Sequence, residues 1–146
     1  MPDSNASLPP EVADFVKRHP EIESVDAIYP DLSGVSRGKR YPADQLAKIY
    51  SSGLNFPGSV FLLAANGESM DPEGFGFSDG DPDEIARPVP GTLRPVTWAP
   101  RPLAQVLLSF ETIDGAPYRF EPRNLLKSVL ERFAELELKP VVAFEL

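Results

Sequence analysis

The residues whose side chains could most readily take part in binding or catalysis lie between Lys48 and Arg87, a stretch without basic residues. The acids in this stretch are Glu68, Asp71, Glu73, Asp79, Asp81, Asp83 and Glu84. Alternating carboxylates can bind a hard metal ion, or raise the local concentration of a positively charged substrate. An EF-hand does not fit, because its sixth and twelfth positions, counted from Asp79, hold Glu84 and Pro90. We favour a solvated turn leading into a strand over a structural metal site.

Other common catalytic sets are missing from the sequence. The absence of cysteine excludes a thiolate zinc site and a cysteine nucleophile. His19 is the single histidine, and it is expected to cap a helix or face solvent. No glycine-rich loop is followed by Lys-Ser or Lys-Thr, so a P-loop is not present.

Composition narrows the class of protein. The chain has 146 residues and 42% hydrophobic content, enough for one domain with a real core and an appendage. A net charge of −8 argues against nucleic acid or an anionic membrane as the main partner, because both need basic residues to neutralise phosphates. No apolar run approaches the roughly 18 residues of a membrane span, and the N-terminus does not resemble a secretion signal. A cytoplasmic protein is expected.

Proline, glycine and apolar spacing predict the elements that position these residues. Residues 1–20 are expected to form a polar tail and a short helix, residues 22–42 a hairpin, and the next segment a helix ending at Gly53. Residues 54–85 are expected to form a long loop that is packed by phenylalanines. Strands are expected over residues 85–89, 94–98 and 103–112, a helix from Pro122, and a last strand over 139–146.

That last strand is followed by no turn or polar tail, which predicts that the chain is the front part of a longer protein. The fold class is then α+β. Residues 1–20 form a tail and short helix, residues 21–113 a mixed sheet with a covering helix, and residues 114–146 the first helix and strand of a truncated second domain.

Over residues 22–146, the order and spacing of several motifs resemble the glutamine synthetase superfamily. The motifs are Asp31-Leu32-Ser33-Gly34 with Arg37-Gly38-Lys39, Gly53-x-x-Phe56-x-Gly58-Ser59, Asp81-x-Asp83 with Pro88-x-Pro90-Gly91-Thr92-Leu93 and Trp98, Asp114-Gly115-x-Pro117, Pro122-Arg123-x-x-Leu126, and Phe144-Glu145-Leu146. The resemblance implies an N-terminal β-grasp (ubiquitin-like) domain followed by the start of a catalytic domain.

The resemblance also implies an ATP-dependent ligase. In that family ATP phosphorylates the γ-carboxylate of glutamate and an amine displaces the phosphate, while Mg²⁺ or Mn²⁺ neutralises the phosphates. The active site lies between neighbouring subunits of stacked rings, so a ring-shaped homododecamer is expected. The present chain alone is expected to be inactive, and binding of ATP or metal by it alone is not expected.

Individual roles follow from the same resemblance. Glu145 matches a metal ligand, and Asp83 matches an acidic position facing the neighbour's site. The amine loop reads Phe56-Pro57-Gly58-Ser59, whereas ammonia-using members have Asp in place of Pro57. Because proline can neither accept a proton nor hold ammonium, the sequence looks like the γ-glutamylpolyamine (putrescine) synthetase branch.

Three alternatives stay open. The first is a glutamine synthetase that uses ammonia. The second is a stand-alone β-grasp interaction module without chemistry of its own. The third is a ligase-like protein that has lost catalysis and serves structure or regulation.

Overall fold

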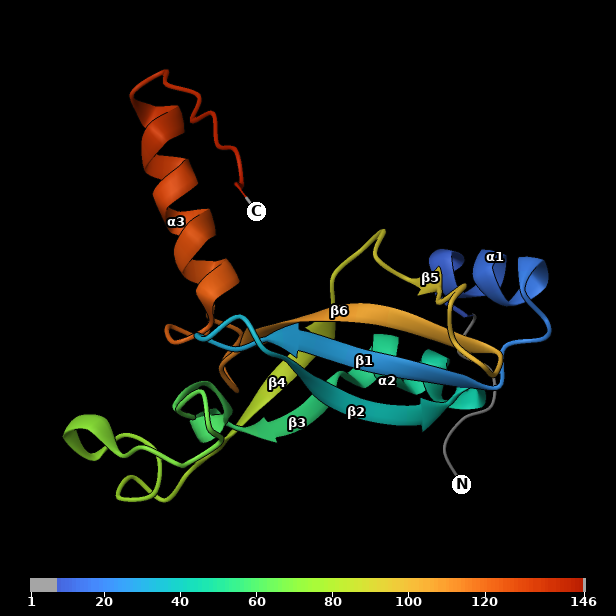
Figure 1. Ribbon diagram of the computed structural model, residues 1–146, viewed down its shortest axis with the longest axis horizontal. Helices are drawn as coiled ribbons and strands as arrows, with labels where there is room; N and C mark the ends of the chain where they lie inside the picture. Colours follow the sequence, from blue (N-terminus) through green and yellow to red (C-terminus); the bar gives the residue numbers. More distant parts are fainter. Residues whose placement is uncertain (1–7, 146) are drawn as a thin grey trace.

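The computed structural model describes residues 8–145, and its centre is one mixed, curled sheet (Figure 1). The strand order is β2-β1-β6-β4-β3, and β5 pairs with β6 beside this path. The strands are β1 (Ser24–Pro30), β2 (Ser36–Pro42), β3 (Leu54–Pro57), β4 (Asp83–Pro88), β5 (Arg94–Pro95) and β6 (Leu103–Glu111). The β1–β6 pair is parallel and the other pairs are antiparallel. The predicted hairpin and the α+β fold class are confirmed.

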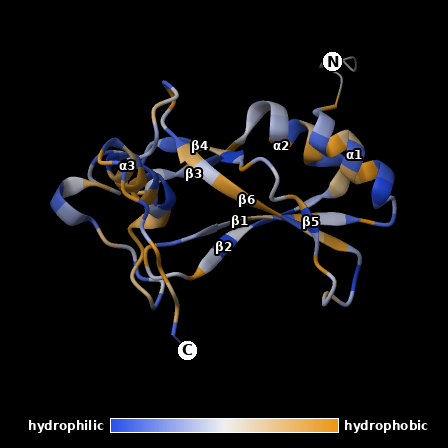
Figure 2. Cartoon of the chain, turned by 90° about the horizontal axis from the view of Figure 1, so that it is seen from above, coloured by the Kyte–Doolittle hydropathy of each residue, from blue (hydrophilic) through white to orange (hydrophobic). Residues whose placement is uncertain are grey.

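Two helices pack against this sheet. They are α1 (Pro10–Arg18) and α2 (Leu46–Ser52), the latter preceded by a 3-10 turn, η1 (Ala43–Gln45). Both helices line the same surface pocket and place buried side chains in the central core, Phe15 from α1 and Ile49 from α2. Figure 2 shows the two helices next to each other. Gly53 follows α2 with a φ of 73°, a conformation that glycine adopts without strain. The predicted helix end at Gly53 is therefore confirmed.

An aromatic cluster joins the strands to the segment after α2. The rings of Phe61 and Phe110 lie 4.7 Å apart, and those of Tyr29 and Phe110 lie 5.0 Å apart, both in T-shaped pairs. Phe61 ends a 3-10 turn, η2 (Gly58–Phe61), and a further turn is η3 (Pro72–Gly74). The interpretation of residues 54–85 as loop throughout is wrong for β3, a four-residue strand too short to show a clear alternation.

The C-terminal part stands away from the sheet (Figure 1). Helix α3 (Pro122–Glu135) forms as expected, but apolar side chains on it such as Leu125 and Leu126 are exposed. The predicted strand over 139–146 is wrong for residues 139–145, which are irregular and pair with no strand among the described residues; Leu146 lies outside them. A strand needs the backbone hydrogen bonds of a neighbour. None of the described helices is long and apolar enough to span a bilayer.

Candidate functional site

A pocket of about 390 Å³ lies where β3 ends and the chain returns into β4. Three segments far apart in the sequence form it: the start of η2, the acidic turn before β4, and the loop before α3. Its charged, aromatic and small lining residues include Gly58, Ser59, Phe75, Asp79, Asp81, Glu84, Tyr118, Arg119 and Phe120. The structure thus brings half of the predicted amine loop together with the acidic turn.

Gly58 allows the close approach that builds one wall of this pocket. Its N–H donates to the Pro82 carbonyl at 3.0 Å, and its own carbonyl accepts from the Tyr118 hydroxyl at 3.1 Å. A Cβ atom at position 58 would lie only 2.6 Å from that hydroxyl oxygen. Glycine is therefore required at position 58, because the Cβ atom of any other residue would clash with the Tyr118 hydroxyl.

Replacing Gly58 with alanine is therefore expected to lower the free energy of unfolding by about 2 kcal/mol. Urea denaturation measures this value. In a Tyr118→Phe background, which lacks the hydroxyl, the same substitution is expected to cost clearly less. An equal cost in both backgrounds would contradict a clash with the hydroxyl.

Asp81 orients Ser59 across 22 residues of sequence. Its carboxylate accepts the Ser59 N–H at 3.0 Å and the Ser59 hydroxyl at 2.8 Å. Its own N–H donates to the Asp79 carboxylate at 2.9 Å. The acidic run is thus the predicted turn leading into a strand. Within residues 8–145 no group of three His, Cys, Asp or Glu side chains is placed to hold a metal ion. Sequence reasoning included Asp81 in a motif but missed its role in positioning Ser59.

Glu84 is the least expected feature of the pocket. Only 8% of the residue is exposed, and among residues 8–145 its carboxylate has no hydrogen bond or ion pair. Burial raises the pKa of the Glu84 carboxyl, and the negative charge of Asp114 raises it further. Burial also raises the pKa of Tyr118 to about 12, with the charge of Glu84 as the next cause. Sequence reasoning counted Glu84 among solvated acids, whereas in β4 it shares its face with the buried Ala86.

Aromatic rings and one guanidinium also line the pocket. The Arg119 guanidinium carbon lies 4.1 Å from the centroid of the Phe75 ring and 4.5 Å from that of Phe120. Arg119 thus already makes the kind of cation–aromatic contact that this wall offers.

The other predicted site residues lie outside the pocket. The register pairs Phe56 with Glu84 and Pro57 with Asp83, so Pro57 and the exposed Asp83 share the opposite face of this two-stranded ribbon. Phe56 is buried in the aromatic cluster. Glu145 is exposed in the irregular segment after α3. The assigned roles of these residues stay predictions.

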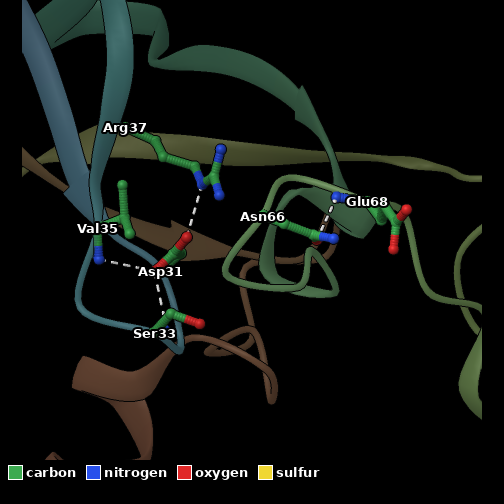
Figure 3. Close-up of polar contacts among 6 residues, drawn as sticks. All are labelled: Asp31, Ser33, Val35, Arg37, Asn66 and Glu68. Atoms are coloured by element: carbon green, nitrogen blue, oxygen red, sulfur yellow. Dashed lines mark hydrogen bonds and ion pairs between the residues drawn. The ribbon is translucent and has the colours of Figure 1, made fainter.

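The hairpin motif forms a turn that is held by hydrogen bonds to the Asp31 side chain (Figure 3). The Asp31 carboxylate accepts the N–H groups of Ser33 at 2.9 Å and Val35 at 2.8 Å, and pairs with Arg37 Nε at 2.6 Å. Asn66 caps a second turn in the same view by accepting the Glu68 N–H at 3.1 Å. Asp31 therefore fixes the loop geometry of the hairpin.

Several known proteins are similar to this chain in sequence and in fold, although no family model matches it. It is 39% identical over 136 residues to γ-glutamylputrescine synthetase PuuA of Escherichia coli K12, covering 93% of this chain and 29% of that protein. It is 31% identical over 136 residues to a glutamine synthetase of Pyrococcus abyssi, covering 92% of this chain and 27% of that protein.

A solved structure, the GmaS/ADP complex in conformation 1, agrees with the fold. The TM-score is 0.64 at 30% identity, and the match covers 86% of this chain and 26% of that chain. This chain spans less than a third of the length of these relatives. On shared sequence and shared fold together, the chain belongs to the glutamine synthetase superfamily.

Proposed function

We propose that this chain is the N-terminal portion of an ATP-dependent ligase that joins the γ-carboxyl of glutamate to an amine through γ-glutamyl phosphate. The amine is a polyamine such as putrescine. The relationship to γ-glutamylputrescine synthetase carries this proposal. A carboxylate is a poor electrophile, and phosphorylation gives it a leaving group that an amine can displace.

The end of β3 supports an amine larger than ammonia. Pro57 offers neither a carboxylate to hold ammonium nor a base to remove its proton. Asp83 is the register partner of Pro57 and is exposed on the same face. We assign Asp83 the contact with the reacting amine, and residues 56–59 the loop that shapes the amine site.

Metal, ATP and neighbouring subunits complete the proposal. Glu145 has the hard oxygen donors that Mg²⁺ or Mn²⁺ prefers, and the metal would neutralise the ATP phosphates when bound. No group of three candidate ligands forms around Glu145 within residues 8–145, so the metal would need further ligands from outside this chain. Self-association into a ring-shaped dodecamer would bring Asp83 to the catalytic domain of a neighbour.

The test is a ligase assay of the longer protein that contains this chain, with glutamate, ATP and either putrescine or ammonia. γ-Glutamylputrescine is the expected product. Pro57→Asp is expected to raise kcat/KM for ammonia at least about 10-fold, because it restores a proton acceptor. Pro57→Ala is the matched control and should not raise it. Efficient glutamine formation from ammonia by the unaltered protein would overturn the polyamine assignment.

A further inference from the structure

A small hairpin follows η2 and contributes no lining residue to the candidate pocket. The Met70 N–H donates to the Leu62 carbonyl at 3.0 Å, and the Ala64 N–H donates to the Glu68 carbonyl at 2.8 Å. Residues 65–67 form the loop at its tip, and all three are exposed. The backbone and side chains of this tip are therefore in contact with water.

The tip contains Asn66 followed by Gly67, the one Asn-Gly pair of the sequence. The Asn66 side-chain carbonyl accepts the Glu68 N–H at 3.1 Å (Figure 3). The Gly67 N–H donates to the Ala64 carbonyl at 2.8 Å, as expected for a three-residue hairpin loop that ends in a glycine of positive φ, here 85°. A Cβ atom on Gly67 would meet nothing within 4 Å, so the space beside this residue is open.

The other asparagines that the structure describes, Asn55 and Asn124, lack this combination. Asn55 lies in β3 and is followed by Phe56, whose ring is buried in the aromatic cluster. Asn124 lies in α3 and is followed by Leu125, and its side-chain amide donates to two backbone carbonyls at 2.7 and 3.1 Å. A side chain on the following residue crowds the backbone nitrogen, and a regular helix or strand restricts the backbone dihedrals. Among the described asparagines, Asn66 is the one in an exposed loop with a glycine after it.

We propose that Asn66 is a site of spontaneous deamidation, with water as the only co-reactant. The backbone nitrogen of Gly67 attacks Cγ of Asn66 and closes a five-membered succinimide ring, a step favoured because both groups lie on adjoining residues. The Cγ–Nδ2 bond breaks, and Nδ2 leaves as ammonia with the proton that the Gly67 nitrogen loses. Water then opens the ring at either carbonyl. Opening at Cγ gives aspartate, and opening at the backbone carbonyl carbon of Asn66 gives isoaspartate.

The two products have different effects on the hairpin. Aspartate at position 66 keeps an oxygen that can accept the Glu68 N–H, and it adds a negative charge to a stretch without basic residues. Isoaspartate also adds one methylene group to the main chain, so the three-residue loop no longer fits the Ala64–Glu68 hydrogen bond. We therefore expect the Met70 amide to exchange with solvent faster in the isoaspartyl product, but not in the Asn66→Asp variant.

The experiment is incubation of the 146-residue chain at about 37 °C and about pH 8, followed by proteolysis and mass spectrometry. Deamidation is read from the mass gain that accompanies the exchange of NH₂ for OH, and chromatography separates the isoaspartyl from the aspartyl peptide. Conversion of Asn66 is expected to be at least about 10-fold faster than that of Asn55 and Asn124. It should slow near pH 6, because the Gly67 nitrogen must lose its proton.

Gly67→Ala is the main control, because its Cβ crowds the attacking nitrogen. This variant should slow conversion of Asn66 about 10-fold or more, although the positive φ at position 67 strains alanine and loosens the loop. Asn66→Gln should also be slow, because its cyclic product needs a six-membered ring. The two variants act on different atoms, so a loosened loop alone does not account for both results.

Equal conversion rates at the three asparagines would overturn the inference. So would an unchanged rate in Gly67→Ala, or aspartate formed without isoaspartate, which would mean direct hydrolysis of the amide. These measurements require neither substrate nor ATP, so their outcome is independent of the ligase proposal.

Discussion

Replacing Asp31 with alanine is expected to lower the free energy of unfolding by about 3 kcal/mol. The Asp31 side chain is almost completely buried and neutralises Arg37, while two backbone N–H groups of the turn donate to it. The substitution leaves these donors without their acceptor and Arg37 without its ion pair, and each loss is costly at a buried position. Urea denaturation at pH 7 measures the difference.

A matched control is Asp26→Ala, which removes another aspartate of the same hairpin. Asp26 pairs with Arg40 at 2.7 and 2.8 Å, but the Arg40 side chain is 62% exposed. Solvent screens such a pair, so a loss below about 1 kcal/mol is expected. Equal losses for Asp31→Ala and Asp26→Ala would contradict the argument.

The pH dependence of the free energy of unfolding provides a second test of the role of Asp31. Burial opposes ionisation, but hydrogen bonds from Arg37, Val35 and Ser33 outweigh it and lower the pKa of Asp31. A lowered pKa contributes stability above the unfolded-state value, near 3.9, and that contribution is lost as the pH falls through the folded-state value. The deficit of Asp31→Ala should therefore be constant above about pH 5 and shrink in more acidic solution.

Replacing Glu121 with alanine is expected to cost about 3 kcal/mol of unfolding free energy. This fully buried residue precedes α3, and its Oε2 accepts the Ser109 hydroxyl at 2.8 Å and the Phe110 N–H at 3.2 Å. Alanine would leave a cavity and a buried N–H without an acceptor. Asn124 would still hold the start of α3 through the carbonyls of Phe110 and Tyr118.

Glu121→Gln should behave differently, because it keeps an acceptor and removes the charge. Burial raises the pKa of Glu121, and hydrogen bonds from Ser109 and Phe110 only partly offset it. A raised pKa contributes stability below the unfolded-state value, about 4.3, and this is lost as the pH rises through the folded-state value. Urea denaturation between pH 4 and 8 should therefore show a flatter stability profile for Glu121→Gln. Parallel profiles would count against a buried ionisable group at this position.

Local patterns in the sequence were sufficient for most elements of the fold. Alternation over β1, the helical spacing after Pro122 and the glycine after α2 are properties of neighbouring residues, so they can be read without coordinates. Motif order was sufficient for the family resemblance. The strand expected over 139–146 shows the limit, because an apolar run predicts a strand only where a partner strand is available.

The environment of each acidic side chain was decided only in three dimensions. The sequence grouped Asp81, Asp83 and Glu84 as one acidic run. In the structure Asp81 accepts hydrogen bonds from Ser59, Asp83 is exposed opposite Pro57, and Glu84 is buried among the residues that line the pocket. A one-residue step in a strand reverses the direction of a side chain, and contacts across 22 or more residues depend on how the sheet closes. Composition therefore determined that carboxylates are concentrated here, whereas tertiary packing determined which one is exposed and which one is buried.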